Sequence, residues 1–171
     1  MNYIKLKSLY LKTFTEQDVL DYCQLNNLNS DNITELDLSN NRLTNISGIR
    51  HFKNLKILYL ENNYITDISV LKDLENLENL DLSYNEIKDI SDLKKLNKLK
   101  TLLINVIYIT DTSVIKNLNS LETLGINYLN LESNQIKYIQ SLKNLKYLYS
   151  RNGFKDMKVL KQLNQNIKVI K

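Results

Sequence analysis

The strongest constraint on this chain is a pattern that recurs at a fixed interval. The pattern Leu-x-Leu-x-x-Asn-x-(Ile/Leu)-x-x-Ile begins at Leu36, at Leu58 and at Leu80, so successive copies stand 22 residues apart. A constant period of this size is the sequence signature of a solenoid, in which each repeat forms one coil and buries its apolar side against the neighbouring coils. The 171 residues are therefore expected to form a stack of coils.

Within each coil the pattern assigns separate tasks to its residues. The two leucines alternate as in a short strand with one buried face. The asparagines Asn41, Asn63 and Asn85 are expected to turn the chain inward and to form a ladder, in which their amides satisfy backbone groups that a tight turn leaves unpaired. The rest of each coil has an apolar residue at every third position, as in Ile46, Ile49, Phe52 and Leu55. A period of three favours short 3₁₀ turns on the outer side.

Before the repeats, residues 1–32 are predicted to form a strand and a helix that cover the apolar end of the stack. Residues 3–12 alternate and are interpreted as the strand, and Leu9 and Leu11 precede Leu36 and Leu38 by 27 residues. This spacing is compatible with a longer first coil.

A helix is expected to follow, from Thr15 to about Asn26. Thr15 is a suitable N-cap, and Asp18 stands at the third helical position of a capping box. Phe14 and Val19 occupy the two positions of a hydrophobic staple. The inner side of this helix is expected to bury Val19, Leu20, Cys23 and Tyr22.

The repeats resemble those of leucine-rich repeat proteins of the 22-residue class. The segment Ile65-Thr-Asp-Ile68-Ser-Val-Leu71-Lys-Asp-Leu74-Glu-Asn-Leu77 is similar to repeats of bacterial internalins and of the leucine-rich regulatory subunit of protein phosphatase 1. The resemblance covers about residues 33–163. It implies an α/β fold, a right-handed solenoid with a concave parallel β-sheet and a convex side of 3₁₀ and short helical turns. Residues 33–171 are then the repeat region, about six coils that become irregular from 102 onward.

The fourth repeat departs from the pattern, because Ile107 stands where the ladder asparagine belongs and Thr112 replaces an isoleucine. The asparagine ladder is expected to be interrupted here, with a looser turn or a compensating water. Drift in a tolerant repeat and a deliberate apolar patch both account for this change.

The fifth repeat contains extra residues. If Gly125–Leu129 are treated as an insertion that forms a bulge at the concave rim, Leu124 is followed by Leu131, and Asn134 resumes the ladder. Alternatively, the strand itself shifts to Leu129 and Leu131. Further on, Ser150 and Gly153 replace the second leucine and the asparagine of the sixth coil. Strands at the end of a sheet invite pairing with another chain, so the C-terminal end is a candidate for self-association or for truncation.

The residues around the strand leucines are the candidates for function, because in this fold they face the concave surface. The early coils place carboxylates there and the later coils place tyrosines, which offer a large contact area with few rotors to freeze. Leu103 is an apolar residue at a solvent-facing strand position. The alternative explanation is that tyrosine is common in strands for β-propensity alone. The candidate protein-binding residues are Asp37, Tyr59, Glu61, Tyr64, Asp81, Tyr84, Leu103, Tyr108, Tyr128, Tyr147 and Tyr149.

The net charge of +4 does not indicate a nucleic-acid partner. The lysines fall mainly on the outer segments, where aspartate and glutamate are interleaved with them, and no nucleic-acid motif is present. The sequence also has no apolar run long enough to span a membrane.

Chemical motifs for an enzyme are missing from the sequence. His51 is the one histidine and is interpreted as a surface residue, and Cys23 as part of a helix core. No cysteine and histidine cluster for a metal, no phosphate-binding loop and no nucleophile with its partners is present. Asp37 and Asp81 stand two coils apart with Tyr59 between them, which suits recognition better than acid–base chemistry. We expect no cofactor.

These observations predict a non-catalytic module that binds a partner protein on its concave face, as an adaptor or regulatory subunit. The start of the chain has no long apolar run of a signal peptide, and one cysteine cannot form an intrachain disulfide. Both point to the cytoplasm. The alternative is a secreted or surface-attached host-interaction factor like the internalins.

Overall fold

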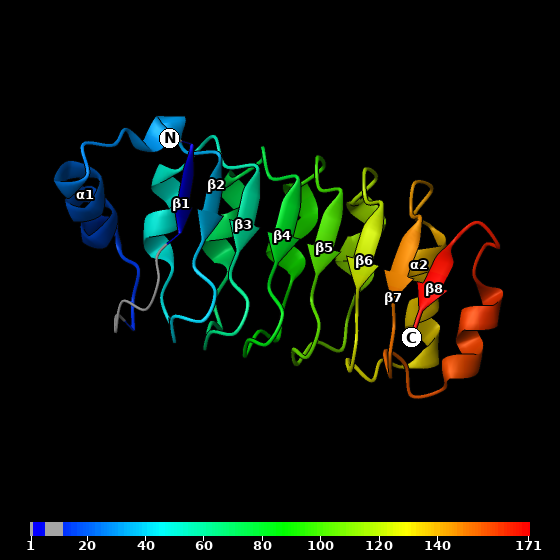
Figure 1. Ribbon diagram of the computed structural model, residues 1–171. Helices are drawn as coiled ribbons and strands as arrows, with labels where there is room; N and C mark the ends of the chain where they lie inside the picture. The colour runs from blue at the N-terminus through cyan, green and yellow to red at the C-terminus, as the bar shows by residue number, and fades with distance from the viewer. Residues whose placement is uncertain (1, 6–11) are drawn as a thin grey trace.

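The computed structural model describes residues 2–5 and 12–171. Within these residues, eight short parallel strands form one sheet in chain order. Figure 1 shows the strands side by side, with α1 at one end of the stack and β8 at the other. The strands are β1 Tyr3–Lys5, β2 Glu35–Asp37, β3 Ile57–Tyr59, β4 Asn79–Asp81, β5 Thr101–Leu103, β6 Thr123–Gly125, β7 Tyr147–Tyr149 and β8 Lys168–Ile170. This architecture confirms the solenoid that the period predicts and the α/β leucine-rich repeat fold that the resemblance implies.

The other side of each coil is formed by helical turns, most of them 3₁₀, as the three-residue apolar period predicts. The helices are α1 Glu16–Leu25, α2 Ile136–Gln140 and the 3₁₀ helices η1 Ser30–Asn32, η2 Ser47–His51, η3 Ser69–Asp73, η4 Ser91–Lys95, η5 Ser113–Asn117, η6 Ser133–Gln135 and η7 Met157–Gln162. The core lies between the sheet and these turns, and one continuous cluster of buried leucine, isoleucine, valine and phenylalanine fills it.

Repeated side-chain caps start the outer turns. An aspartate or asparagine oxygen accepts a hydrogen bond from the backbone amide two residues later, at 2.8–2.9 Å, in five coils. Such a cap satisfies an amide that the short turn cannot pair internally. The capping residues are Asn45, Asp67, Asp89, Asp111 and Asp156.

The predicted asparagine ladder is present and ties each coil to the one before it. Asn63 Oδ1 accepts from the amides of Asn41 and Leu43 at 3.1 and 2.9 Å. Its Nδ2 donates to the carbonyl oxygens of Leu38 and Leu60 at 3.0 and 2.9 Å. One buried side chain therefore satisfies four backbone groups in two coils. Asn85 repeats three of these bonds one coil later, while the Asn63 backbone amide donates to the Tyr84 carbonyl oxygen at 3.3 Å.

The ladder stops at Ile107, as predicted, and a second ladder begins two residues away. Ile107 is buried and has no side-chain amide. The N–H of Ile87 therefore lacks the side-chain acceptor that the N–H of Ile65 has in Asn85. At the edge of the sheet, Ser83 Oγ accepts from Asn105 at 3.0–3.2 Å. This second ladder continues over two more coils. The Asn127 amide donates to Asn105 Oδ1 at 2.8 Å, and the Arg151 amide donates to Asn127 Oδ1 at 2.7 Å.

The fifth repeat differs from the expectation. Leu124 pairs with Leu102 and Leu148 without a shift, so neither the bulge at Gly125–Leu129 nor the shifted strand is correct. Leu129 is buried at the ladder position. Compared with the regular coils, the two additional residues fall after Leu131, within the turn that leads to α2. The prediction that Asn134 resumes the ladder is wrong, because Asn134 is exposed in η6.

This longer turn also explains Thr112, which is fully buried in the preceding coil. Its hydroxyl and its backbone amide both donate to Gln135 Oε1, at 3.1 and 2.9 Å. The hydroxyl thus has an acceptor that a regular coil would not supply.

At the N-terminal end the capping box is confirmed. Thr15 Oγ1 accepts from the Asp18 amide at 3.4 Å, and Asp18 Oδ2 accepts from the Thr15 amide at 2.6 Å. Phe14 and Val19 are both buried, and the Phe14 ring stacks on Phe52 at 6.4 Å between centroids. The helix ends at Leu25, with Asn26 as its C-cap.

Other details at this end were predicted wrongly. Leu20 is 50% exposed and does not belong to the core. Ile4 of β1, not Leu9, is paired with the first core position through Leu36. Leu9 and Leu11 lie outside the described residues. The first coil thus spans 32 residues from Ile4 to Leu36, which makes room for α1.

Candidate functional site

The residues on either side of each central strand residue form two rows on the concave face of the sheet. Strand pairing puts the candidates Asp37, Tyr59, Asp81, Leu103 and Tyr149 into one row, one per strand, with Gly125 between the last two. Tyr147 belongs to the other row, where it is paired with Thr123 of the preceding strand. Glu61 lies just beyond the first row, two residues after Tyr59. The sequence therefore identified these rows correctly.

At the N-terminal end of the first row, the negative charge of Asp37 is already balanced by a cation within the protein. Its carboxylate forms an ion pair with the Lys5 ammonium and accepts from the Ser39 amide at 3.0 Å. Burial raises the pKa of the Asp37 carboxyl, but the hydrogen bonds from Lys5 and Ser39 outweigh burial and hold the pKa below its ordinary value. Asp37 is consequently less available to a partner than its position in the sequence suggested.

The neighbouring part of the face, around Tyr59 and Glu61, keeps its negative charge. Burial, followed by the charges of Asp81 and Asp37, raises the pKa of the Glu61 carboxyl. Burial and the neighbouring carboxylates also raise the pKa of the Tyr59 hydroxyl. The half-buried Tyr59 ring thus lies among carboxylates in neighbouring coils, and a cation bound here would relieve their mutual repulsion.

Leu103 has a packing partner that the sequence did not reveal. A Cβ added to Gly125 would lie 2.9 Å from Leu103 Cδ2 and 3.0 Å from Asn105 Oδ1. The Leu103 side chain therefore lies over the bare backbone of the next strand and fills the space left by the missing side chain. Its half-buried state follows from this contact.

Four candidate tyrosines lie in the turns that follow the strands, outside the sheet itself. Each of the coils that begin at Leu58, Leu80, Leu102 and Leu124 carries one of them. About half or more of each side chain is exposed, and Tyr108 is the most open at 67%. The four are Tyr64, Tyr84, Tyr108 and Tyr128.

The turns contain a further row that the sequence analysis missed. The residue four positions after the first strand leucine has a left-handed backbone in six successive coils, with φ between 50° and 62°. Asparagine, which tolerates this conformation, is found in the first two coils and the last one. The three coils between them carry apolar or aromatic residues instead. The six residues are Asn40, Asn62, Tyr84, Val106, Tyr128 and Asn152.

A left-handed backbone costs a non-glycine residue about 1–2 kcal/mol, and a β-branched residue such as Val106 is a genuine outlier there. The 22-residue spacing of Asn40 and Asn62 is the signal that could have revealed this row in the sequence.

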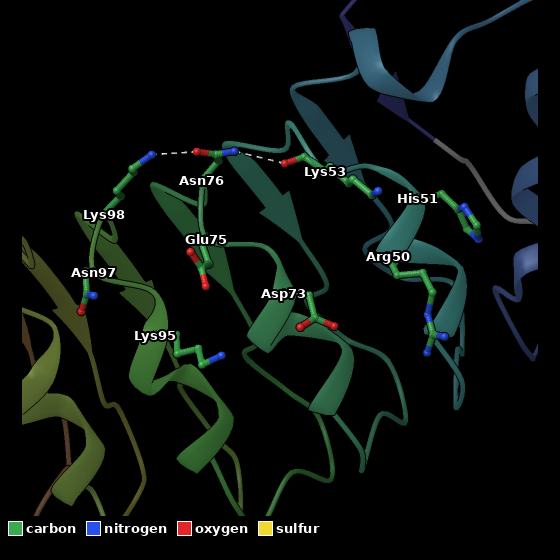
Figure 2. A pocket seen from close by; sticks show the side chains of 9 residues that line it. All are labelled: Arg50, His51, Lys53, Asp73, Glu75, Asn76, Lys95, Asn97 and Lys98. Atoms are coloured by element: carbon green, nitrogen blue, oxygen red, sulfur yellow. Dashed lines mark hydrogen bonds between the residues drawn. The ribbon is translucent and has the colours of Figure 1, made fainter.

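On the convex side, the turns η2, η3 and η4 line an open groove with a cavity volume of about 780 Å³ (Figure 2). Asn76 crosses its rim, donating to the Lys53 carbonyl oxygen at 3.2 Å and accepting from Lys98 Nζ at 2.7 Å. Cations and anions alternate along the groove, with Asp73 and Glu75 among the basic residues. It has the character of a solvated polar face.

His51 contributes to the packing of α1 on the first repeats. Its Nε2 atom lies 3.3 Å from Glu16 Oε1, so the ring connects η2 to the start of α1. The prediction of a plain surface residue missed this pairing between helix and repeat.

Two kinds of site do not occur in the part of the chain that the structure describes. None of its histidine, cysteine, aspartate and glutamate side chains gather in a group of three or more that could hold a metal ion. None of its helices combines the length and the apolar character needed to cross a bilayer.

Two family models match the chain. The model "Leucine Rich repeats (2 copies)" matches residues 31–73, and the model "Leucine rich repeat" matches residues 53–106. Both cover the regular coils, and neither describes an enzyme family.

Solved structures extend the similarity over most of the chain. An internalin (inlF) of Listeria monocytogenes is 30% identical over 81% of this chain and 41% of its own, with a TM-score of 0.73. Internalin inlC2 of the same species is 34% identical over 81% of this chain and 61% of its own, with a TM-score of 0.70. A leucine-rich repeat protein of Leptospira interrogans is 21% identical over 98% and 53%, with a TM-score of 0.67, which supports the fold alone.

The chain thus spans about two fifths to three fifths of the length of these solved proteins. A comparison with curated proteins finds no match. The asparagine ladder, the parallel sheet with 3₁₀ turns opposite it, and the matching family models all lead to one assignment: the chain is a leucine-rich repeat protein.

Proposed function

We propose that this protein is a non-catalytic module that binds a partner protein with its concave face and the adjoining turns. Leucine-rich repeat folds are typical of protein–protein interaction modules. The proposed binding surface runs from the carboxylates around Tyr59 to the tyrosines Tyr147 and Tyr149 on β7, and includes the four exposed tyrosines of the turns.

The position of the turn tyrosines is the observation that carries this proposal. β-propensity accounts for tyrosine within strands, but Tyr64, Tyr84, Tyr108 and Tyr128 lie outside the strands. Tyr84 and Tyr128 even have left-handed backbones, which disfavour them. An exposed aromatic residue in an unfavourable conformation does not help the fold, whereas tyrosine is enriched among the residues that dominate protein interfaces.

Alanine substitutions on the two sides of the solenoid test the proposal. The double variant Tyr147→Ala and Tyr149→Ala removes two exposed rings from the sheet face, and Tyr138→Ala is the matched control in α2 on the opposite side. Affinity purification from the source organism, followed by calorimetry with the purified partner, should show that the double variant loses binding and the control keeps it. Equal binding by both variants would overturn the proposal.

We propose the role of a cytoplasmic adaptor or regulatory subunit. The free thiol of Cys23 suits a reducing compartment such as the cytoplasm. The alternative is a secreted or surface-attached factor, which the similarity to two internalins favours. Fractionation of source cells and medium with an antibody separates the two, because accumulation in the medium or on the surface excludes the first.

Self-association through the C-terminal end belongs to the same proposal. In the described sheet β8 has a neighbour on one side, β7, and Val169 of β8 and the preceding Ile167 are only partly buried. An unpaired edge above a partly open core favours pairing with a second copy. Sedimentation equilibrium over a wide concentration range should detect a dimer, and a constant monomer mass would refute this point.

A further inference from the structure

The strongest unexplained feature is the apolar stretch of the left-handed row, formed by Tyr84, Val106 and Tyr128. These residues stand at one position in three successive coils, with φ of 57°, 53° and 59°. Asn62 precedes the stretch at the same position and Asn152 follows it, also with positive φ. The change from asparagine to apolar residues is thus confined to neighbouring coils, and we call these three residues the apolar row.

Folding alone gives no reason for this change. Asparagine adopts the left-handed conformation more easily than tyrosine or valine. The two tyrosine side chains are 50% and 47% exposed, and Val106 is partly exposed. The free energy gained by burying them therefore offsets little of the strain energy of the backbone. Strained residues of this kind concentrate at functional sites, where the observed outlier justifies a functional hypothesis.

The spacing of the apolar row restricts what can lie on it. Tyr84 and Tyr128 are two coils apart, which at the spacing of parallel strands is about 9–10 Å. A polyproline II helix repeats every three residues at about 3.1 Å per residue, so one turn advances about 9 Å. Such a helix lying along the stack would present the same side to Tyr84 and, one turn later, to Tyr128. Val106 lies between the two rings.

The charges around the apolar row give the ligand a direction. Asp81, Glu86 and the repelled carboxylate of Glu61 lie in the coils at the Tyr84 end. At the Tyr128 end, Arg151 Nη1 lies 3.5 Å from the tyrosine hydroxyl oxygen. A complementary ligand therefore carries a cation over the Tyr84 end.

We propose that the apolar row binds a proline-rich segment of a partner in the polyproline II conformation, with a basic residue of that segment at the acidic end. The proposal rests on the proposed protein-binding function and specifies the partner's chemistry. Proline rings pack well on tyrosine faces, and the preformed helix loses little conformational freedom on binding. Backbone carbonyls, which this helix leaves unpaired, can accept hydrogen bonds from tyrosine hydroxyls.

The test is a titration of the chain into a dye-labelled peptide of about ten residues, Pro-Pro-Leu repeated with arginine at one end, followed by fluorescence anisotropy. A control peptide replaces each proline with glycine or serine and keeps the arginine. The expected result is a saturable rise with the first peptide and about tenfold weaker binding of the second. Equal binding of both peptides, or of neither, overturns the inference.

The variant Tyr84→Asn with Tyr128→Asn makes the test specific, because asparagine suits the left-handed backbone and the fold is retained. It should weaken peptide binding about tenfold or more, while the control Tyr138→Asn in α2 leaves binding unchanged. Unchanged binding by the double variant contradicts the placement on the apolar row.

The proposed function fails in a different way. If Tyr147→Ala with Tyr149→Ala abolishes binding of a natural partner and proline-rich peptides do not bind, the general function stands and this inference falls.

Discussion

The hydroxyl of Thr112 donates a hydrogen bond to Gln135 Oε1 in the next coil, 3.1 Å away, although both residues depart from the repeat pattern. The backbone amide of Thr112 donates to the same oxygen. Two irregularities that look independent in the sequence thus compensate for each other, one coil apart.

The change Gln135→Ala is expected to lower the free energy of unfolding by about 1–3 kcal/mol, because two buried donors of Thr112 lose their acceptor. Urea denaturation measures this loss. With Thr112→Val the two changes should be non-additive by about 1 kcal/mol, whereas the exposed neighbour Ser133→Ala should have almost no effect. Strict additivity would show that the pair is not coupled.

The left-handed position of Val106 offers a stabilising substitution. Val106→Asn should raise the free energy of unfolding by about 1 kcal/mol, because it relieves steric strain at a side chain that is only partly buried. The reverse change at the equivalent position, Asn152→Val, should lower it by a similar amount. Thermal melts of both variants provide the measurement. A loss of stability in Val106→Asn would mean that packing of the valine outweighs the strain.

Gly48 controls how α1 contacts the repeats. A Cβ at this position would lie 2.3 Å from the Thr15 carbonyl oxygen and 2.7 Å from Val19 Cγ2, and the Gly48 amide donates to the Phe14 carbonyl oxygen at 2.8 Å. Because backbone cannot move aside easily, Gly48→Ala should displace α1 at a cost of about 1–3 kcal/mol.

Hydrogen exchange distinguishes displacement of α1 from global unfolding. Amides of residues 16–25 should exchange faster in Gly48→Ala, while those of the later coils keep their protection. Ser47→Ala is the control, and equal exchange of α1 in both variants would be evidence against a tight helix contact at this glycine.

The raised pKa of the Glu61 carboxyl predicts a pH-dependent effect. A raised value means that the folded state binds this proton more readily than the unfolded state, so the ionised group is destabilising at neutral pH. Glu61→Gln should therefore be more stable than the parent at pH 7. The difference should shrink as the pH falls through the raised value and vanish below the ordinary glutamate pKa of about 4.3.

Chemical denaturation at several pH values measures this difference, and high salt should reduce it by screening Asp81 and Asp37. Glu86→Gln, at an exposed position in the next coil, is the control. A pH-independent difference for Glu61→Gln would show that the pKa of this carboxyl is not raised in the folded protein.

The period made the fold predictable, because core residues such as Leu58 and ladder residues such as Asn63 recur at positions that serve one purpose. The errors arose where several residue types fit the same space. Leu129 fills the ladder position of its coil as a purely apolar residue, so a search for asparagine led to Asn134 and placed the insertion too early. The actual extra residues lie in an exposed turn, where sequence patterns impose little.

The candidate site was only partly predictable. Strand pairing follows directly from the period, so Tyr59, Asp81 and Tyr149 could be assigned to the concave face. The Lys5 partner of Asp37 depends on a register of 32 residues that no repeat reveals. The left-handed backbone of Tyr84 depends on the turn geometry, which only the column of asparagines at the same position could have indicated.

The ladders imply a distinctive response to force. Asn63, Asn85 and Asn105 bond within their own coil or to an adjacent one, so none of these ladder bonds spans the stack, and in the described chain α1 packs on the N-terminal end. A pull on the two ends of the chain would therefore peel coils away one at a time, beginning at β8. Each regular coil of 22 residues would release roughly 75 Å of chain, and the protein would lengthen under force in a series of nearly equal steps.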